Sequence, residues 1–268
     1  MARINVPKDW KLKSQTLLNE VFQQQVQNQH YLWKEGAAKR ELTSRILLKL
    51  TKDDPAINQL MKEAEEETLA LAKQPLPEPQ LTKKEVRVHP KEDFSPTSIH
   101  LTSFTPWTSN NFGFANTTPA VGFDLSTAGG DHNEACSVAL GASFQPSPGS
   151  GQLTINLNAT VTYSYGNHAF LKSARTHGWI GLFIAEYDVA SGVHVQTSFQ
   201  HQSDLWNYTH DSDVGDNLPH SIPLTATIES VPEHRYEIWL WAGGDVSSNA
   251  TSYGNLKASM TDMFIRLS

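Results

Sequence analysis

The densest group of side chains that could hold an ion lies in the segment HQSDLWNYTHDSDVGDNLPH, residues 201–220. Its hard oxygen donors, the ligand type that Ca²⁺ prefers, are Asp211, Asp213, Asp216 and Asn217. The spacing is not that of an EF-hand, because Gly215 falls one place early and no Glu follows at the twelfth position. The segment therefore predicts either a calcium site or an acidic, solvated loop with Asx turns.

A group of histidines and the single cysteine are weaker candidates for a chemical role. His201, His210 and His220 could join the same acids around zinc, although alternation along the preceding strand places His201 at the edge of a core face. Cys136 opens the run CSVALGASF, whose alternation predicts a small buried side chain rather than an activated nucleophile. Because it is the single cysteine of the chain, no internal disulfide is expected.

Catalytic motifs of the common kinds are absent from the sequence, which holds no G-x-S-x-G, P-loop, G-x-G-x-x-G or H-E-x-x-H. Carboxylate pairs for glycoside cleavage could be drawn from Asp131 and Glu134, or from Glu186 and Asp188. Cleavage, however, requires two acids that face each other across a groove. We therefore predict that the protein is not an enzyme, with a sandwich-fold polysaccharide-cleaving enzyme as an alternative.

Aromatic residues in polar segments suggest a different kind of site. Trp107 lies in FTPWTSNNFGF and Trp206 in DLWNY, both expected to be loops. Aromatic rings beside amides bind neutral sugars by stacking and by hydrogen bonds to hydroxyls. The candidate ligand-binding residues are Trp107, Trp206, Asn207 and Tyr208. The competing interpretation is that these aromatics plug one end of a sandwich.

Two segments alternate in a way that makes both faces of a strand apolar. In GWIGLFIAEY, Trp179 and Phe183 share one face, while the other face carries Ile180, Leu182 and Ile184. In YEIWLWA, Trp239 and Trp241 lie opposite the aliphatic side chains. Strands that are apolar on both faces are normally covered on both. We expect a covered or interface face that includes Trp239, Trp241, Ile180, Leu182 and Ile184. Its cover would be the N-terminal helices, a neighbouring subunit or the opposing half of a strongly curved sandwich, and an exposed aromatic platform for a ligand is the alternative.

The elements that must position these residues begin with helices. Residues 1–74 are predicted to be a helical docking or oligomerisation segment, in which Leu18 and Phe22 begin an apolar stripe. The sequence GAA at 36–38 is expected to interrupt the first helix. A later helix is predicted from Pro55, after a capping aspartate, with apolar residues spaced by three and four as in a coiled coil. Stripes this narrow make a poor core on their own, so the helices should bury against a sister chain, a partner or the next domain.

The rest of the chain is expected to be mainly β. Residues 75–97 contain alternating prolines and predict an extended linker. From residue 98 to 268 the period is two, most clearly in LTINLNATVTYSY at 153–165, and turn signals separate about eight to ten strands. This pattern predicts an antiparallel β-sandwich or jelly roll. In SVPEHRYE, a Tyr near the start of a strand is expected to anchor the preceding corner.

Charge limits the partners. Residues 1–93 hold 16 Lys and Arg against 14 Asp and Glu, whereas residues 94–268 hold 5 against 14. A surface with that balance repels phosphate backbones and anionic polysaccharides, so no nucleic-acid partner is expected. Neutral glycans, protein surfaces and divalent cations remain as partners. No cofactor is predicted apart from calcium as a candidate ion.

The N-terminal sequence MARINVPKDWKLKSQ has no apolar run of signal-peptide length, and no stretch has the roughly 20 apolar residues of a membrane span. We therefore expect a protein made without a signal peptide, either cytoplasmic or released in a particle. With its Ser-, Thr- and Asn-rich surface, the chain is predicted to be a homo-oligomeric structural or recognition component of a virion, a phage tail or a similar particle. A lectin-like module, with or without calcium, is the first alternative.

Overall fold

The computed structural model describes residues 10–76, 87–90, 105–115, 121–127, 132–146, 151–169, 173–210, 212–248 and 252–267. Within these ranges the elements are α1 (Trp10–Thr51), α2 (Pro55–Ala72), β1 (Arg87–Pro90), β2 (Thr105–Thr108), β3 (Gly113–Ala115), β4 (Val121–Ser126), β5 (His132–Phe144), β6 (Gln152–Ala169), β7 (Ala174–Asp188), β8 (His194–His210), β9 (Ser212–Glu229), β10 (His234–Ser248) and β11 (Ser252–Leu267). This is a mainly β chain with an N-terminal helical segment, as the sequence predicts.

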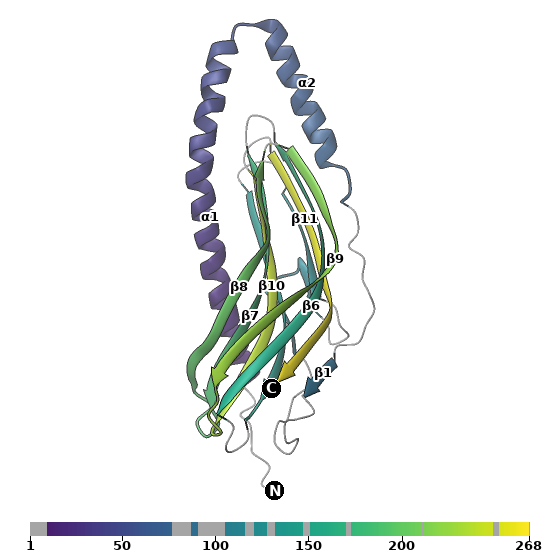
Figure 1. The fold of residues 1–268 in the computed structure, drawn as a ribbon. Coiled ribbons are helices and arrows are strands. Elements are labelled where there is room, and N and C mark those ends of the chain that lie inside the picture. The colour runs from purple at the N-terminus through teal and green to yellow at the C-terminus, as the bar shows by residue number, and fades with distance from the viewer. Residues whose placement is uncertain are drawn as a thin grey trace.

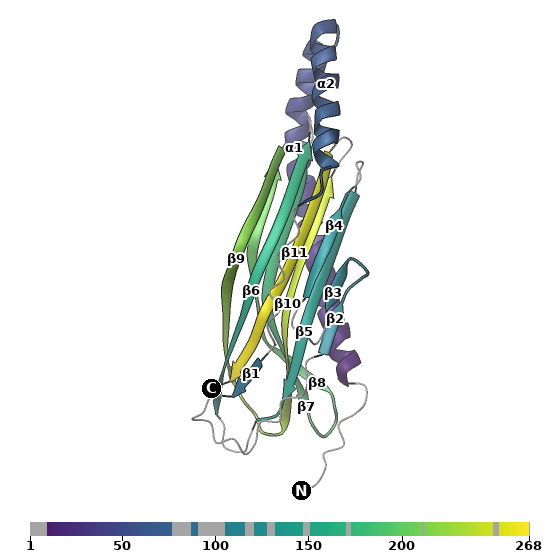
Figure 2. The ribbon, with the colours of Figure 1, turned by 90° about the vertical axis from the view of Figure 1, so that its right-hand side faces the viewer.

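The strands form two sheets that face each other (Figures 1 and 2). Sheet A has the order β3-β4-β11-β6-β9, and sheet B has the order β2-β5-β10-β7-β8. Neighbouring strands on these paths are antiparallel, so the predicted antiparallel sandwich is confirmed. β1 is the exception, since it pairs in parallel with residues 264–267 of β11. These four residues fall within the range predicted as linker, and they belong to sheet A.

The core between the sheets follows the predicted alternation. Along β6, Leu153, Ile155 and Val161 are buried, whereas Thr154 and Asn156 lie at the outer surface of sheet A. Facing side chains of sheet B complete this inter-sheet core, among them Ile180, Leu182, Ile184, Tyr236, Ile238 and Leu240. Burial of alternate side chains from two facing sheets is what holds a sandwich together.

The corner before β10 is tied by a tyrosine, as its sequence suggests. The backbone N–H of Val231 donates to the hydroxyl of Tyr236 over 3.0 Å, and the Tyr236 ring stacks on Phe144 with centroids 5.2 Å apart. The hydroxyl also donates to the carboxylate of Glu186 at 3.0 Å. The ring therefore belongs to the inter-sheet core while its polar end fixes the turn.

α1 is one uninterrupted helix of 42 residues, so the break expected at residues 36–38 is wrong. A single Gly in a helix costs only about 1 kcal/mol relative to Ala, and the two alanines that follow Gly36 are strong helix formers. The start predicted for α2 is confirmed, because Asp54 accepts hydrogen bonds from the N–H groups of Ala56 and Ile57 at 2.9 and 3.2 Å. Neither described helix has the length and apolar character needed to cross a membrane.

The two helices lie on opposite sides of the sandwich. α1 runs along the outer face of sheet B and continues past the ends of the strands, and α2 returns toward sheet A, where it contacts β6 and β11 (Figure 1). Trp33 is the last described residue of α1 that is buried. We call residues 34–73, which follow it, the helical arm. The helices diverge from their turn instead of forming a coiled coil with each other along their length.

Candidate functional site

An aromatic cluster fills the outer face of sheet B beneath α1. Its sheet residues include Trp179, Phe183, Trp239 and Trp241, all fully buried. From α1, Leu18 and Phe22 pack onto them, with the Phe22 and Trp179 ring centroids 6.4 Å apart. The layer predicted over the indoles is therefore the N-terminal helix of the same chain. The sequence grouped Ile180, Leu182 and Ile184 with Trp239 and Trp241; the structure instead places the three aliphatic residues on the other face, in the inter-sheet core.

Glycines make room for these indoles. The register pairs Trp239 with Gly141, Trp241 with Gly181, and Trp179 with Gly243. A Cβ atom at Gly243 would lie 2.4 Å from the ring of Trp179 and 2.8 Å from a backbone oxygen, closer than real contacts allow. Because each neighbouring position lacks a side chain, the indoles lie against the sheet backbone and α1 can approach over them.

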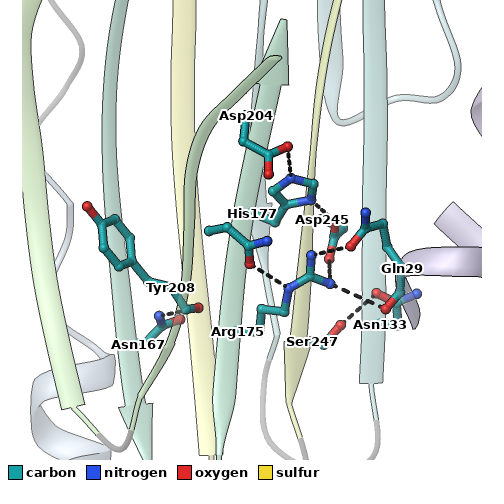
Figure 3. Close-up of polar contacts among 10 residues, drawn as sticks. Gln29, Asn133, Asn167, Arg175, His177, Asp204, Tyr208, Asp245 and Ser247 are labelled. Carbon is teal, nitrogen blue, oxygen red and sulfur yellow. Dashed lines mark hydrogen bonds and ion pairs between the residues drawn. The ribbon is translucent and has the colours of Figure 1, made fainter. Parts of the chain in front are cut away.

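Next to this cluster lies a buried polar network centred on Arg175 (Figure 3). Its guanidinium donates from Nη1 to Oδ1 of Asp245 at 3.1 Å and from Nε to Oδ1 of Asn207 at 3.1 Å. Nη2 donates to Oε1 of Gln29, in α1, at 2.7 Å. The network therefore links β7, β8 and β10 to the helix that covers them.

His177 is the second centre of this network, and its side chain is completely buried. Nδ1 lies 2.9 Å from Oδ2 of Asp245, and Nε2 lies 2.8 Å from Oδ1 of Asp204. Since both ring nitrogens face carboxylates, neither is available as a base toward a bound molecule. The arrangement can position α1 on sheet B, and we assign it that role.

A second buried carboxylate, Glu186, lies at the other end of β7. It accepts hydrogen bonds from Ser198 Oγ at 2.6 Å, from Gln196 Nε2 at 2.8 Å, and from Tyr236 and His234. Burial alone would raise the pKa of Glu186, but these four hydrogen bonds outweigh it and lower the pKa below its usual value. All of its described partners are side chains of this chain, so the carboxylate orders the corner and the edge of sheet B.

The proposed sugar-binding residues do not form one surface. Trp206 lies in strand β8 rather than in a loop, is 3% exposed, and stacks on Tyr163 in the inter-sheet core with ring centroids 4.0 Å apart. Trp107, in β2, is half-buried and packs against the aromatic cluster on the opposite face of sheet B. Tyr208 is 36% exposed and stacks on Tyr165 of sheet A with ring centroids 4.7 Å apart. The exposed Asn207 points to the opposite face of β8, toward Arg175.

The acidic segment predicted as a loop is instead the start of β9. Asp213 and Asp216 lie opposite Asn167 and Ser164 of β6, and Asn217 lies opposite Tyr163. Extended pairing with a long neighbouring strand has overridden the local turn signals. Asp211 lies outside the described residues, as do the side chains of the other three. In the part of the chain that the structure describes, no three His, Cys, Asp or Glu residues are grouped so as to hold a metal ion.

Other candidate groups serve structural purposes where they are described. Cys136 is buried as predicted, and burial raises the pKa of its thiol to about 11. Asp188 accepts hydrogen bonds from the N–H and hydroxyl of Ser191 at 2.7 and 2.6 Å, which shapes a turn. Of the other proposed carboxylate pair, Asp131 lies outside the described residues and Glu134 is half-buried in β5.

The helical arm carries large apolar side chains at its surface. On α1 these are Leu42, Ile46, Leu47, Leu48 and Leu50, the last being 80% exposed. On α2 they are Leu60, which is 63% exposed, and Leu71. Clusters of exposed apolar side chains of this kind mark surfaces that bind other protein or membrane. The arm is thus the described part of the chain whose surface is least suited to water.

Comparison with known proteins finds similarity among solved structures. No protein-family model matches the chain, and no curated protein matches it. Among solved structures, it is similar to the enzymatically active domain of bacteriophage CBA120 tailspike protein 4, at 14% identity and a TM-score of 0.26, over 64% of this chain and 19% of that one. The chain thus spans about a fifth of the tailspike domain's length.

Two carbohydrate-binding modules are also similar. One is TmCBM61, solved with β-1,4-galactotriose, at 15% identity and a TM-score of 0.22 over 64% of this chain and 88% of that one. The other is a CBM28 module specific for non-crystalline cellulose, at 9% identity and a TM-score of 0.24 over 71% and 97%. The likeness lies in the β-sandwich fold alone.

Proposed function

We propose that the protein is a non-enzymatic structural or recognition component of a larger assembly, such as a virion, a phage tail or a similar particle. The helical arm attaches the chain to other protein, and the β-sandwich supplies the surface that the assembly presents. The observation that carries this proposal is the row of exposed apolar side chains on the arm, of which Leu42, Ile46 and Leu50 are more than half exposed.

The attachment of the arm to the sandwich supports the same function. α1 is fixed on sheet B by the aromatic cluster and by the contact between Gln29 and Arg175. Because the arm is the continuation of this fixed helix, it holds a set direction relative to the sandwich. Buried titratable groups such as His177 and Glu186 hold elements together, which favours a structural role over catalysis.

The proposal predicts that the arm controls assembly in the cells that produce the protein. A chain with Leu42→Asp, Ile46→Asp and Leu50→Asp should leave the fast-sedimenting fractions in which the unaltered chain is found. The measurement is sedimentation of cell extracts followed by detection of the chain. Since the three side chains are exposed, the melting temperature of the purified variant should stay within a few degrees of the original. Equal sedimentation of both chains would contradict the proposal.

Carbohydrate binding is a second candidate, and the exposed ring of Tyr208 on edge strand β8 favours it. Stacking on Tyr165 holds the Tyr208 ring in place, while the neighbouring Asn207 points to the opposite face of the strand, toward Arg175. An exposed aromatic ring held in a fixed position can stack on a sugar.

This candidate predicts that a neutral oligosaccharide raises the melting temperature of the protein, because a ligand that binds only the folded state stabilises it. Tyr208→Ala should abolish that rise, while Phe112→Ala, at another exposed aromatic, should keep it. A panel of cello-, galacto- and xylo-oligosaccharides in a thermal-shift assay tests the idea. If no sugar shifts the melting temperature, or if Tyr208→Ala retains the shift, the candidate is wrong.

A further inference from the structure

The two helices of the helical arm carry opposite charge. Residues 34–52, in α1 and the turn, hold six Lys and Arg against two Glu, a net charge of +4. Residues 53–73, mostly in α2, hold six Asp and Glu against two Lys, a net charge of −4. The charges of the arm therefore cancel overall but are separated onto its two helices.

On α1, the basic residues flank an apolar stripe. Leu42, Ile46 and Leu50 recur every four residues and so share one face of the helix. The exposed Arg45 and Lys49, one turn apart, lie along one edge of that stripe. Leu18, Phe22 and Trp33, in the earlier part of α1 that packs on sheet B, are buried, whereas these three lie farther along the helix and are exposed.

On α2, the acidic residues occupy the matching place. Leu60, Ala64 and Leu71 share a face by their spacing, and the exposed Glu63 and Glu67, one turn apart, lie along its edge. Each helix thus presents an apolar stripe bordered by charge, basic on one helix and acidic on the other.

Within one chain these surfaces do not meet. From their turn beyond the strand ends, the two helices diverge, α1 toward the outer face of sheet B and α2 toward β6 and β11 of sheet A (Figures 1 and 2). The exposed side chains of Leu50 and Leu60 show that both stripes face solvent even close to the turn. A second copy of the chain would bring to each stripe a partner of complementary charge.

We propose that the arm binds a second copy of this chain, with α1 of one copy packing on α2 of the other. This inference rests on the proposed function, in which the arm is the attachment surface, and adds the identity of the partner. Contacts between two α1 helices or two α2 helices would bring like charges together, whereas α1 against α2 pairs +4 with −4 and buries both apolar stripes. Because each chain carries both complementary surfaces, two copies of the chain are able to bind each other.

Charge reversal tests the pairing. One variant carries Arg45→Glu and Lys49→Glu, a second carries Glu63→Lys and Glu67→Lys, and a third carries all four substitutions. Light scattering coupled to gel filtration measures the mass of each purified full-length chain, for which a single copy is 29.8 kDa. The unaltered chain should have at least twice that mass. Each two-substitution variant should dissociate, with a Kd raised by about tenfold or more as like charges are brought together.

Restoration separates this arrangement from others. The four-substitution variant should self-associate again, because both charges at each contact are reversed. An equimolar mixture of the two dissociated variants should associate as well, since each supplies the helix that the other needs. A monomeric unaltered chain, or a four-substitution variant that stays dissociated, would overturn the inference. All the altered side chains are exposed, and equal melting temperatures show that the variants remain folded.

The two proposals fail in different ways. If the purified chain is monomeric but its sedimentation in cell extracts still depends on Leu42, Ile46 and Leu50, the arm binds a different protein and the self-association is wrong. If the purified chain associates through charge-paired arms but the arm has no influence on sedimentation in cells, the self-association stands and the proposed function is wrong.

Discussion

Asp245→Ala is expected to lower the free energy of unfolding by about 4 kcal/mol, among the largest effects of any single substitution in this chain. Asp245 is 2% exposed. Its carboxylate accepts a hydrogen bond from the guanidinium of Arg175 and lies next to Nδ1 of His177. Its removal leaves a buried guanidinium without its acidic partner. Breaking one side of a buried ion pair is destabilising because the other charge stays buried and unpaired.

Asp204→Ala is the matched control for this experiment. Asp204 lies within hydrogen-bond distance of Nε2 of His177, but the side chain of Asp204 is 54% exposed. Water can therefore replace the carboxylate of Asp204 when it is removed. We expect a loss of no more than about 1 kcal/mol for this change. Urea titrations followed by circular dichroism give both values. Equal losses for the two variants would show that burial of the ion pair is not what stabilises this region.

The architecture of the protein follows from its sequence patterns to a large extent. Alternation at residues 153–165 identifies the buried face of β6, and the pattern around Tyr236 identifies the anchored corner. The apolar character of both faces in the segments of Trp179 and Trp239 indicates that the outer face of sheet B is covered. In each of these cases the signal is local, because neighbouring positions of one strand decide which side chains are buried.

The position of Trp206 could not be derived in the same way. β8 pairs with β7 through three register shifts, and at one of them Trp206 lies opposite Gly178 while Asp204 lies opposite Trp179. A bulge inserts a residue and reverses which side chains face the core from that point on. Simple counting along the strand therefore fails beyond the bulge, and the polar neighbours of Trp206 suggested a loop.

The polar network was also missed, although one signal for it exists. Its members come from α1, β7, β8 and β10, and Gln29 is 146 residues from Arg175, so no spacing along the chain connects them. Arg175, His177 and Asp245 do, however, belong to β7 and β10, two strands whose other residues are largely apolar on both faces. Ionisable residues in such strands must find partners, and His177 lies directly opposite Asp245 in the register.

The exposed apolar side chains of the arm are the reason that we propose a partner outside the chain. The sequence predicts apolar stripes on the helices, but it does not reveal which stripes the sandwich covers. The structure separates them: the stripe that begins at Leu18 and Phe22 is buried on sheet B, and the one formed by Leu42, Ile46 and Leu50 is exposed. The first stripe is thus covered within one chain, and the second is the one for which we propose a partner.

Trp239→Ala is expected to lower the free energy of unfolding by about 4 kcal/mol and, in addition, to loosen α1 from sheet B. The indole is fully buried between Gly141 of the neighbouring strand and the side chains that α1 brings to the sheet. With no Cβ at Gly141 to fill the space, the substitution opens a large cavity under the helix. Hydrogen exchange should therefore increase in residues 15–33 more than in β6, which packs on the other side of the sandwich.

Ile180→Ala provides the comparison that isolates the helix. Ile180 is equally buried in sheet B but faces the inter-sheet core. Its loss therefore weakens the packing between the two sheets and not the packing of α1 on sheet B. A destabilisation of about 3 kcal/mol is expected, with exchange raised in β6 as much as in α1. If Trp239→Ala left exchange in α1 unchanged while Ile180→Ala raised it, the aromatic cluster would not be what holds the helix. The direction of the arm would then have to be fixed by polar contacts of α1, such as those of Gln29 with Arg175 and of Lys13 with the backbone oxygen of Gly192.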